Sequence, residues 1–366
     1  MIQHEFKQNA YYLIYLIRCV LHYNVPAKEK LDKMNLTQLY EGAKAHSLTA
    51  MTAYALESAD YIPDDFKQAK YKAIRKSISY DIERESVFRD FEKAEIWYVP
   101  LKGTILKEIY PQIGMREMCD NDILFDPTKA DEVNSIMESH GFESSNTHTG
   151  HDIVFHKLPF YNFEMHYSLF SNYKGSRVYK YFSDISERLI GTDSFRRDFT
   201  NEDFYLYMTA HEHHHFIGSG TGLRSLVDAY VFLDKYSDSL DWEYVNRELS
   251  EIGIYEYEHK RRNLVSKLFD GKKLNDDEKE LLDYYIFSST YGTLNNRVKN
   301  KVNKNNSKIK YAISRLFLSL DTIKNVYPYF YEHKILIPFL PAYRIVTSIR
   351  RKNHHIKTEL KTLIKL

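Results

Sequence analysis

The strongest constraint on the fold is a change of pattern at Glu95, where short runs typical of β-strands enter a chain that otherwise has helical spacing. Four runs rich in aromatic and β-branched residues are predicted as strands: 96–101, 120–125, 151–156 and 161–169. Between them, residues 104–110 and 128–140 have helical spacing. Residues 95–170 are therefore predicted to form a small mixed sheet with helices, which is an α+β arrangement.

Helices are expected on both sides of this block. Gly and Pro, the residues that most often end helices, number only 13 and 9 of 366. The Asn-rich stretch 295–307 is interpreted as a linker or exposed loop. We therefore predict four regions: an N-terminal helical region 1–94, an α/β core 95–199, a helical domain 200–292 and a basic C-terminal helical region 293–366.

Charge is unevenly distributed along the chain, although the formal net charge is only +1. Residues 293–366 hold 16 Lys and Arg against 3 Asp and Glu, a balance of +13, so residues 1–292 carry −12. Such a basic region can bind an anionic partner, either a phosphate-rich molecule or an anionic membrane surface. It can equally neutralise the acidic part of the chain or form a solvated helix face.

Several classes of protein are disfavoured by what the sequence lacks. No apolar run approaches the ~20 residues that span a bilayer, and no secretory leader opens the sequence. The two cysteines, Cys19 and Cys119, cannot form a disulfide framework. We therefore expect a cytoplasmic protein without a membrane span.

The strongest chemical signal is Asp120-Asn121-Asp122 on a predicted strand. Side chains two residues apart lie on the same face of a strand, so the two carboxylates are expected side by side. Carboxylates at this spacing repel each other and need a cation between them. Oxygen ligands suit Mg²⁺ or Mn²⁺, and such a site can align the oxygens of a phosphoryl or nucleotidyl transfer.

The residues upstream of this pair are of the kind that bind phosphate. Lys102 and Gly103 lie where the strand 96–101 meets the next helix, and Gly allows a ligand to approach the backbone. Arg116, four residues before Asp120, can bind phosphate oxygens bidentately. The alternative for Lys102 and Arg116 is solvent exposure or pairing with Glu108 or Glu117.

A third carboxylate would complete a metal site. Glu164 lies in the run 161–169, on the same face as His166 and opposite Phe163 and Met165. A glutamate among aromatic neighbours is costly to bury unless it is paired or bound to a metal. Asp152 on the preceding strand is the rival candidate, and the face of Glu164 could also simply be the wet side of the sheet.

Together these motifs resemble the uncharacterised bacterial nucleotidyltransferase family over residues 97–235, with a looser match at 338–344. The matching motifs, in order, are Leu101-Lys102-Gly103, Tyr110-Pro111, Arg116, Asp120-x-Asp122-Ile123-Leu124, Glu164-Met165-His166, His211-x-x-x-His215 and Leu223-Arg224-x-Leu226-x-Asp228. Asn121 departs from the family pattern, which has an apolar residue there. That position faces the core, so its amide needs a hydrogen-bond partner.

The resemblance implies a nucleotidyltransferase fold and Mg²⁺-dependent transfer of a nucleotide from an NTP, most simply ATP, to an unidentified acceptor. It carries the metal role to Asp120, Asp122 and Glu164, which are the expected catalytic residues, while the phosphate site at Lys102, Gly103 and Arg116 rests on the residue types argued above. His166, His211 and His215 are expected to line the acceptor cleft. Two alternatives stay open: transfer of another phospho-group on the same fold, and a non-catalytic nucleotide-binding or antitoxin-like module.

A rival motif lies in the helix that follows Thr200. His211-Glu212-x-x-His215 places two histidines at i and i+4 with a glutamate, the pattern of zinc hydrolases. Both histidines are expected to face inward, but no third ligand follows at a recognised spacing. In the same region, Arg224 and Asp228 are interpreted as an i, i+4 helix ion pair.

Overall fold

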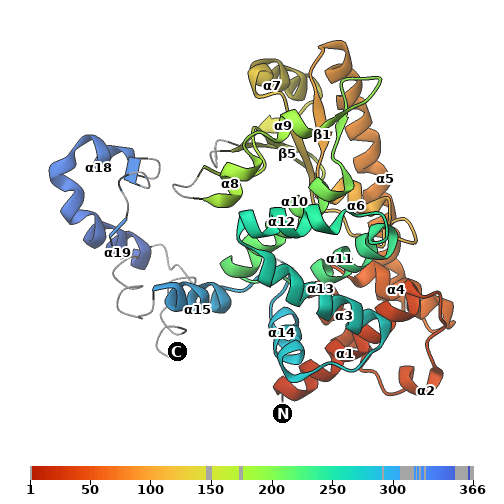
Figure 1. The fold of residues 1–366 in the computed structure, drawn as a ribbon. Coiled ribbons are helices and arrows are strands. Elements are labelled where there is room, and N and C mark those ends of the chain that lie inside the picture. The colour runs from red at the N-terminus through yellow and green to blue at the C-terminus, as the bar shows by residue number, and fades with distance from the viewer. Residues whose placement is uncertain are drawn as a thin grey trace. The chain divides into compact units, whose positions relative to one another are not determined.

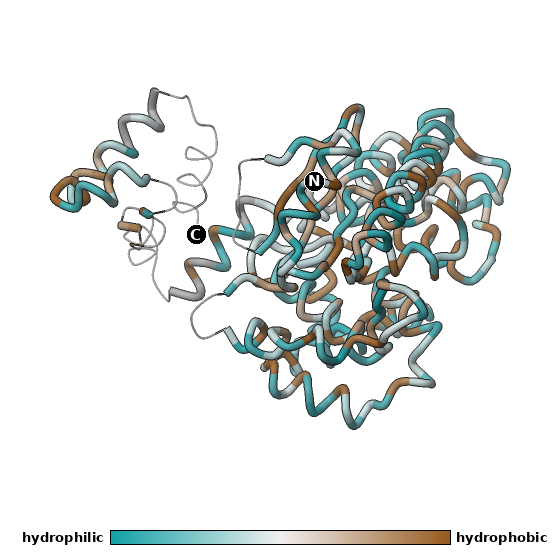
Figure 2. Tube along the Cα trace, turned by 90° about the horizontal axis from the view of Figure 1, so that it is seen from above, coloured by the Kyte–Doolittle hydropathy of each residue, from teal (hydrophilic) through white to brown (hydrophobic). Residues whose placement is uncertain are grey.

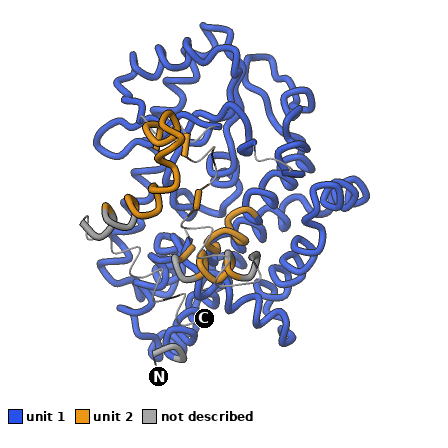
Figure 3. The backbone as a smooth tube through the Cα atoms, turned by 90° about the vertical axis from the view of Figure 1, so that its left-hand side faces the viewer, with its two compact units in different colours: residues 1–213, 222–290 blue, residues 214–221, 291–366 orange. Residues whose placement is uncertain are grey.

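A computed structural model describes residues 2–145, 151–172, 176–290, 292–305, 317–318, 320, 323–324, 327–350 and 362. The chain divides into two compact units, one formed by residues 1–213 and 222–290 and the other by 214–221 and 291–366 (Figure 3). The first unit contains most of the three regions predicted up to residue 292, whose internal boundaries stay a prediction. No helix in the described part of the chain is both long enough and apolar enough to cross a bilayer.

A five-stranded mixed sheet lies in the first unit, as the sequence predicts. Its strands are β1 (Tyr98–Pro100), β2 (Asn121–Phe125), β3 (Glu143–Ser144), β4 (Asp152–Lys157) and β5 (Tyr161–His166). They are ordered β1-β2-β5-β4-β3, and β2 and β5 run parallel while the other neighbours are antiparallel. A short antiparallel pair, β6 (Ile190–Gly191) and β7 (Arg197–Asp198), forms a separate sheet.

Helices precede, cover and follow the sheet (Figure 1). In chain order the first unit has α1 (Ile2–Leu21), α2 (Lys28–Leu31), α3 (Leu36–Ala45), α4 (Thr49–Ser58), α5 (Asp64–Lys93), α6 (Lys102–Lys107), η1 (Pro127–Lys129), α7 (Ala130–Ser139), α8 (Arg177–Phe182), α9 (Ile185–Arg188), α10 (Asn201–Gly218, which ends in the second unit), α11 (Leu223–Tyr236), α12 (Trp242–Ile252), α13 (Tyr255–Asp270) and α14 (Asp276–Ile286). The α+β class predicted from the sequence is thus confirmed.

One face of the sheet is buried against α5 and α7. Phe88 and Phe91 of α5 pack in one cluster with Ile123 of β2 and with Phe163 and Met165 of β5. Because side chains alternate along a strand, burial of these residues directs the intervening side chains of β2 and β5 to the opposite face. The apolar pattern of the two central strands therefore decides which residues are available for chemistry.

The structure corrects several predicted boundaries. Helix α6 begins at Lys102 and ends at Lys107, whereas residues 104–110 were expected to be helical. Strand β5 ends at His166 rather than at 169, and the two-residue strand β3 was not predicted. Asp120 precedes β2 instead of lying within it.

The second unit contains α15 (Leu294–Asn305), α18 (Pro328–Glu332), η2 (Lys334–Phe339) and α19 (Leu340–Arg350). Helix α15 shows that the interpretation of 295–307 as a linker or loop is wrong for its described part. The Thr293 hydroxyl accepts a hydrogen bond from the Asn296 backbone N–H, which caps the helix start, and Val298 is fully buried. Residues 306–307 lie outside the described residues.

A fully buried ion pair joins the helices of the first unit. Arg261 Nη1 of α13 lies 2.6 Å from Glu212 Oε2 of α10. The other carboxylate oxygen of Glu212 accepts hydrogen bonds from Tyr257 of α13 and Tyr285 of α14, both at 2.9 Å. Arg261 also donates to the hydroxyl of Thr209 at 3.2 Å. Each charge therefore depends on the other, because neither is accessible to water.

We expect Arg261→Met to lower the free energy of unfolding by about 3–5 kcal/mol, because it leaves the Glu212 carboxylate buried without its cation. The double variant Glu212→Gln/Arg261→Met should lose less free energy of unfolding than Arg261→Met does, since it removes both buried charges. Urea unfolding measures the difference. The exposed pair of Arg247 and Glu248 provides the control, because Arg247→Met should change stability by less than about 1 kcal/mol. A double variant no more stable than Arg261→Met would contradict this account.

Candidate active site

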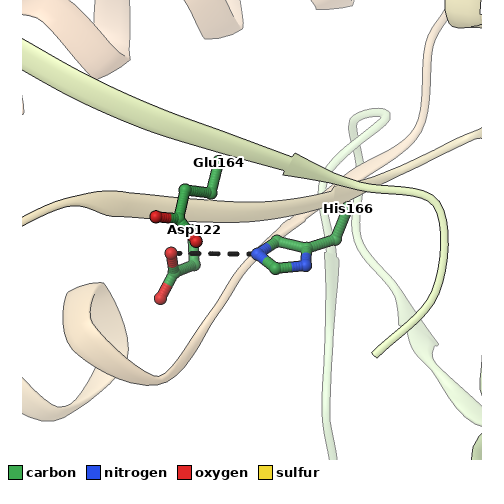
Figure 4. Close-up of side chains that lie close together, drawn as sticks. All are labelled: Asp122, Glu164 and His166. Carbon is green, nitrogen blue, oxygen red and sulfur yellow. Dashed lines mark ion pairs between the residues drawn. The ribbon is translucent and has the colours of Figure 1, made fainter. Parts of the chain in front are cut away.

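Three side chains that can bind a metal ion lie together on the open face of the two parallel strands. In the register of β2 with β5, Asp122 is opposite Glu164 and Leu124 is opposite His166. The potential ligand atoms of Asp122, Glu164 and His166 all lie within 4.8 Å of one another (Figure 4). Strand alternation thus places Asp122, Glu164 and His166 on one face and the core residues Ile123 and Met165 on the other.

Buried polar atoms in this cluster have no hydrogen-bond partner among the described residues. They are Asp122 Oδ1 and both ring nitrogens of His166. The 3.8 Å between His166 Nε2 and Asp122 Oδ1 allows charge attraction but is too long for a hydrogen bond. Glu164 accepts only a 3.3 Å hydrogen bond from the Asn162 amide. Two facing carboxylates with unused oxygens fit a hard divalent cation such as Mg²⁺ or Mn²⁺.

Asp120 lies at the edge of the same acidic cluster. Burial and the negative charges of Asp122 and Glu164 raise its pKa to about 7, against the weaker opposing effect of Arg224 and Arg116. Burial and the charge of Asp122 also raise the pKa of Glu164. The three predicted acids therefore share one electrostatic environment, which disfavours full ionisation without a cation.

His166 is held among these acids. Burial by itself lowers the pKa of His166, but the proximity of Asp122, followed by the charges of Asp152 and Glu164, raises it overall. Asp152, the rival metal ligand, is the cross-strand neighbour of His166 in β4, is 5% exposed and lies 3.4 Å from His151. Asp152 is thus more buried than its polar sequence neighbours indicated.

Lys102 and Arg116, two of the three predicted phosphate-site residues, converge on Asp228 of α11. Arg116 binds this carboxylate through Nε at 2.9 Å and Nη2 at 3.2 Å, and Lys102 Nζ lies 3.7 Å from it. The Tyr110 hydroxyl donates to it at 2.7 Å. Burial opposes ionisation of Asp228, but the two cations outweigh it and lower the pKa of Asp228 to about 2.

Both open alternatives for Lys102 and Arg116, solvent exposure and pairing with Glu108 or Glu117, are wrong, because both side chains are buried against Asp228. The interpretation of Arg224 and Asp228 as a helix pair is also corrected. Arg224 Nη1 donates instead to the carbonyl of Glu117, at 3.3 Å. The role of Gly103 is to leave room for Arg116. A Cβ at position 103 would lie 3.2 Å from Arg116 Nη1, and the same Nη1 donates a hydrogen bond to the Gly103 carbonyl.

The side-chain oxygen of Asn121 has the partner that its burial requires, whereas its Nδ2 is buried without a hydrogen-bond partner among the described residues. Its Oδ1 accepts a 3.2 Å hydrogen bond from Arg84 Nη1 of α5 and a longer one, at 3.5 Å, from the Thr104 hydroxyl. Asn121 is fully buried on the face opposite the acids. The polar residue between the two aspartates therefore ties β2 to α5 without changing the strand register.

The helix α10 is only partly as expected. His211 is half-buried beside the Tyr207 ring, whereas His215 is exposed, so the expectation that both histidines face inward is wrong for His215. Glu212, the general base that a zinc hydrolase would need, is bound to Arg261. This arrangement disfavours the zinc hydrolase interpretation.

Two residues near the acidic cluster, Tyr207 and Arg224, were not predicted from the sequence to lie there. Burial and then the charges of Asp122, Asp120 and Glu164 raise the pKa of Tyr207 well above its usual value, which places this α10 residue beside the acids. With 31 tyrosines in the chain, nothing local distinguishes it. Arg224 is a second cation near Asp120.

Comparison with known families gives one match. A family model described as an uncharacterised nucleotidyltransferase matches residues 32–270, which is more than half of the chain. The match includes all five strands of the mixed sheet, the acidic cluster and Asp228. Comparisons with curated proteins and with solved structures found no significant match.

We expect Asp228→Asn to lower the free energy of unfolding by about 3–5 kcal/mol, because it leaves Lys102 and Arg116 buried without their shared anion. Denaturant unfolding monitored by circular dichroism measures this loss. Asp234→Asn, at an exposed position on the same helix, is the matched control and should change stability by less than about 0.5 kcal/mol. Equal effects of the two substitutions would refute the role given to Asp228.

We expect Asp120→Asn to raise the melting temperature at pH 8 and to have little effect near pH 4, with divalent ions chelated. The folded-state pKa of Asp120 is about 7 and its usual value is 3.8. The folded protein therefore binds more protons than the unfolded chain between these values, and stability falls as pH rises through that window. The asparagine removes this cost. Glu143→Gln, an exposed position on β3, is the control. A difference in melting temperature between Asp120→Asn and the parent that does not change with pH would contradict the raised pKa of Asp120.

Proposed function

The chain belongs to the uncharacterised nucleotidyltransferase family, and on this premise we propose that it transfers a nucleoside monophosphate from an NTP to a separate acceptor. Nucleotidyltransferase-type activity follows from the family match. The finer proposal is that ATP is the donor, that Mg²⁺ or Mn²⁺ is required, and that the acceptor offers a hydroxyl or an amine. The observation that supports it is the convergence of Asp122, Glu164 and His166 on one strand face.

The proposed metal site consists of Asp120, Asp122 and Glu164. The unused oxygen of Asp122 and the raised pKa values of Asp120 and Glu164 are what is expected of carboxylates arranged for a divalent cation. When bound, the cation would neutralise charge on the phosphates and the leaving group. His166 lies beside Asp122 and would attract that carboxylate through its charge.

In the proposed reaction the acceptor oxygen or nitrogen attacks the α-phosphorus, and the bond from that phosphorus to the bridging oxygen of pyrophosphate breaks. The acceptor loses one proton, and pyrophosphate leaves with the electron pair of the broken bond. Glu164 is the proposed proton acceptor, because its carboxylate lies beside Asp122 on the same strand face.

We propose that the triphosphate lies near the turn between β1 and α6. Lys102 and Arg116 share the single carboxylate of Asp228, so this group of three keeps one net positive charge. Arg224, bound to a backbone carbonyl rather than to a carboxylate, adds a second. Lys102 and Arg116 would thus attract the phosphates through their charge, whereas Arg224 is the better candidate for direct contact.

The test is transfer of radiolabel from α-labelled ATP, GTP, CTP or UTP to acceptors in a cell lysate, with Mg²⁺ present. We expect labelling by the parent protein and a loss of about a hundredfold or more in Asp122→Asn, which removes one charge of the metal site. Glu143→Gln should label as the parent does. Equal labelling by the parent and Asp122→Asn would exclude the proposed site.

Two further arms separate the alternatives. Transfer from γ-labelled but not α-labelled ATP would mean that another phospho-group moves and that the nucleotidyl proposal is wrong. A binding module would give no labelling at all, although ATP could still raise its melting temperature. An increase that requires Mg²⁺ and disappears in Asp122→Asn would locate nucleotide binding at the acidic cluster even before the acceptor is known.

A further inference from the structure

The second unit exposes large apolar side chains within a short segment, residues 327–350, which we name the C-terminal apolar segment. Four of its side chains are far more exposed than is usual for their type: Tyr329 (61%), Ile335 (87%), Phe339 (65%) and Tyr343 (49%). Figure 2 shows hydrophobic stretches in this unit between hydrophilic ones. Apolar groups gathered in this way are costly in water unless a partner covers them.

These side chains belong to consecutive short elements. Tyr329 lies in α18, Ile335 and Phe339 in η2, and Tyr343 in α19. Ile335 and Phe339 lie in the same 3-10 helix, and Tyr343 follows in the first turn of α19. The chain thus exposes aliphatic and aromatic groups within one short stretch.

The same part of the chain is strongly basic. Residues 293–366 have 16 Lys and Arg against 3 Asp and Glu. Lys334 is exposed directly beside Ile335, and Arg344 is adjacent to Tyr343. Apart from the exposed Glu332, the charged residues of the C-terminal apolar segment are basic. Apolar groups flanked by cations are complementary to a surface that is anionic outside and apolar beneath, as an anionic lipid bilayer is.

We propose that the C-terminal apolar segment binds the surface of an anionic lipid bilayer. Ile335 and Phe339 enter the boundary between headgroups and acyl chains, Tyr329 and Tyr343 lie at headgroup depth, and the basic side chains contact the lipid phosphates. Because no described helix can span a membrane, this attachment is peripheral and reversible. It goes beyond transfer chemistry, since it specifies where the protein works.

Single-stranded nucleic acid is the main competing partner, because it also attracts basic residues. Its bases bind through stacking on flat aromatic rings. The most exposed apolar side chain here is Ile335, which has no such ring. An aliphatic side chain as the most exposed apolar group of the segment favours the bilayer.

The test is flotation of the full-length protein with lipid vesicles, made either of phosphatidylcholine or of phosphatidylcholine with about one third phosphatidylglycerol. We expect binding to the anionic vesicles, weak binding to the neutral ones, and a several-fold loss when salt rises from about 0.1 M to about 0.5 M. The double variant Ile335→Ser/Phe339→Ser should lower the partition coefficient by about tenfold or more.

The matched control is Ile82→Ser/Leu158→Ser, which removes two equally exposed apolar side chains of the first unit (67% and 90%) and should bind as the parent does. Circular dichroism melts verify that all variants are folded. The proposal is overturned if the folded parent does not float with anionic vesicles, or if Ile335→Ser/Phe339→Ser floats equally well. It is also overturned if a single-stranded RNA binds and displaces the parent while the serine substitutions change nothing.

Discussion

The parallel pairing of β2 with β5 is the constraint on which the rest of the candidate site depends. One register places Asp122 opposite Glu164 and at the same time buries Ile123 and Met165 against α5 and α7. Because side chains alternate with a period of two, a slip by one residue would expose the core positions and bury the acids. The apolar side of these strands thus provides the force that holds two repelling carboxylates together on the other side.

Buried hydrogen bonds and ion pairs fix the positions of the segments that pack around β2 and β5. Asn121 binds Arg84 of α5 from beneath β2, and Asp228 of α11 gathers Lys102, Arg116 and Tyr110 next to it. These contacts gain little free energy relative to apolar packing, but each becomes costly if one partner is lost. Such interactions favour one arrangement of the turn before β2 over many others, so they contribute to the precision of the site more than to its stability.

Alternation along strands explains what the sequence could predict. It places Glu164 and His166 on one face, and a resemblance spread over seven motifs points to the same family as the match over residues 32–270. The partners of Asp228 could not be predicted, because Arg116 is 112 residues away and each residue had a plausible local partner. Tyr207 was missed because only the packing of α10 brings it to the acids. Composition misled at α15, where Asn-rich sequence is helical and Thr293 caps the start of the helix.

The distance along the chain between Arg116 and Asp228 has a consequence for biosynthesis. A nascent polypeptide that has emerged as far as His166 already possesses every acidic ligand of the cluster, yet Lys102 and Arg116 still lack their shared anion. The turn before β2 is completed only when α11 leaves the ribosome and docks, since buried cations are not stable alone. Premature termination before α11 would therefore leave a fragment that has the acidic cluster but lacks the buried ion pairs that order the turn before β2.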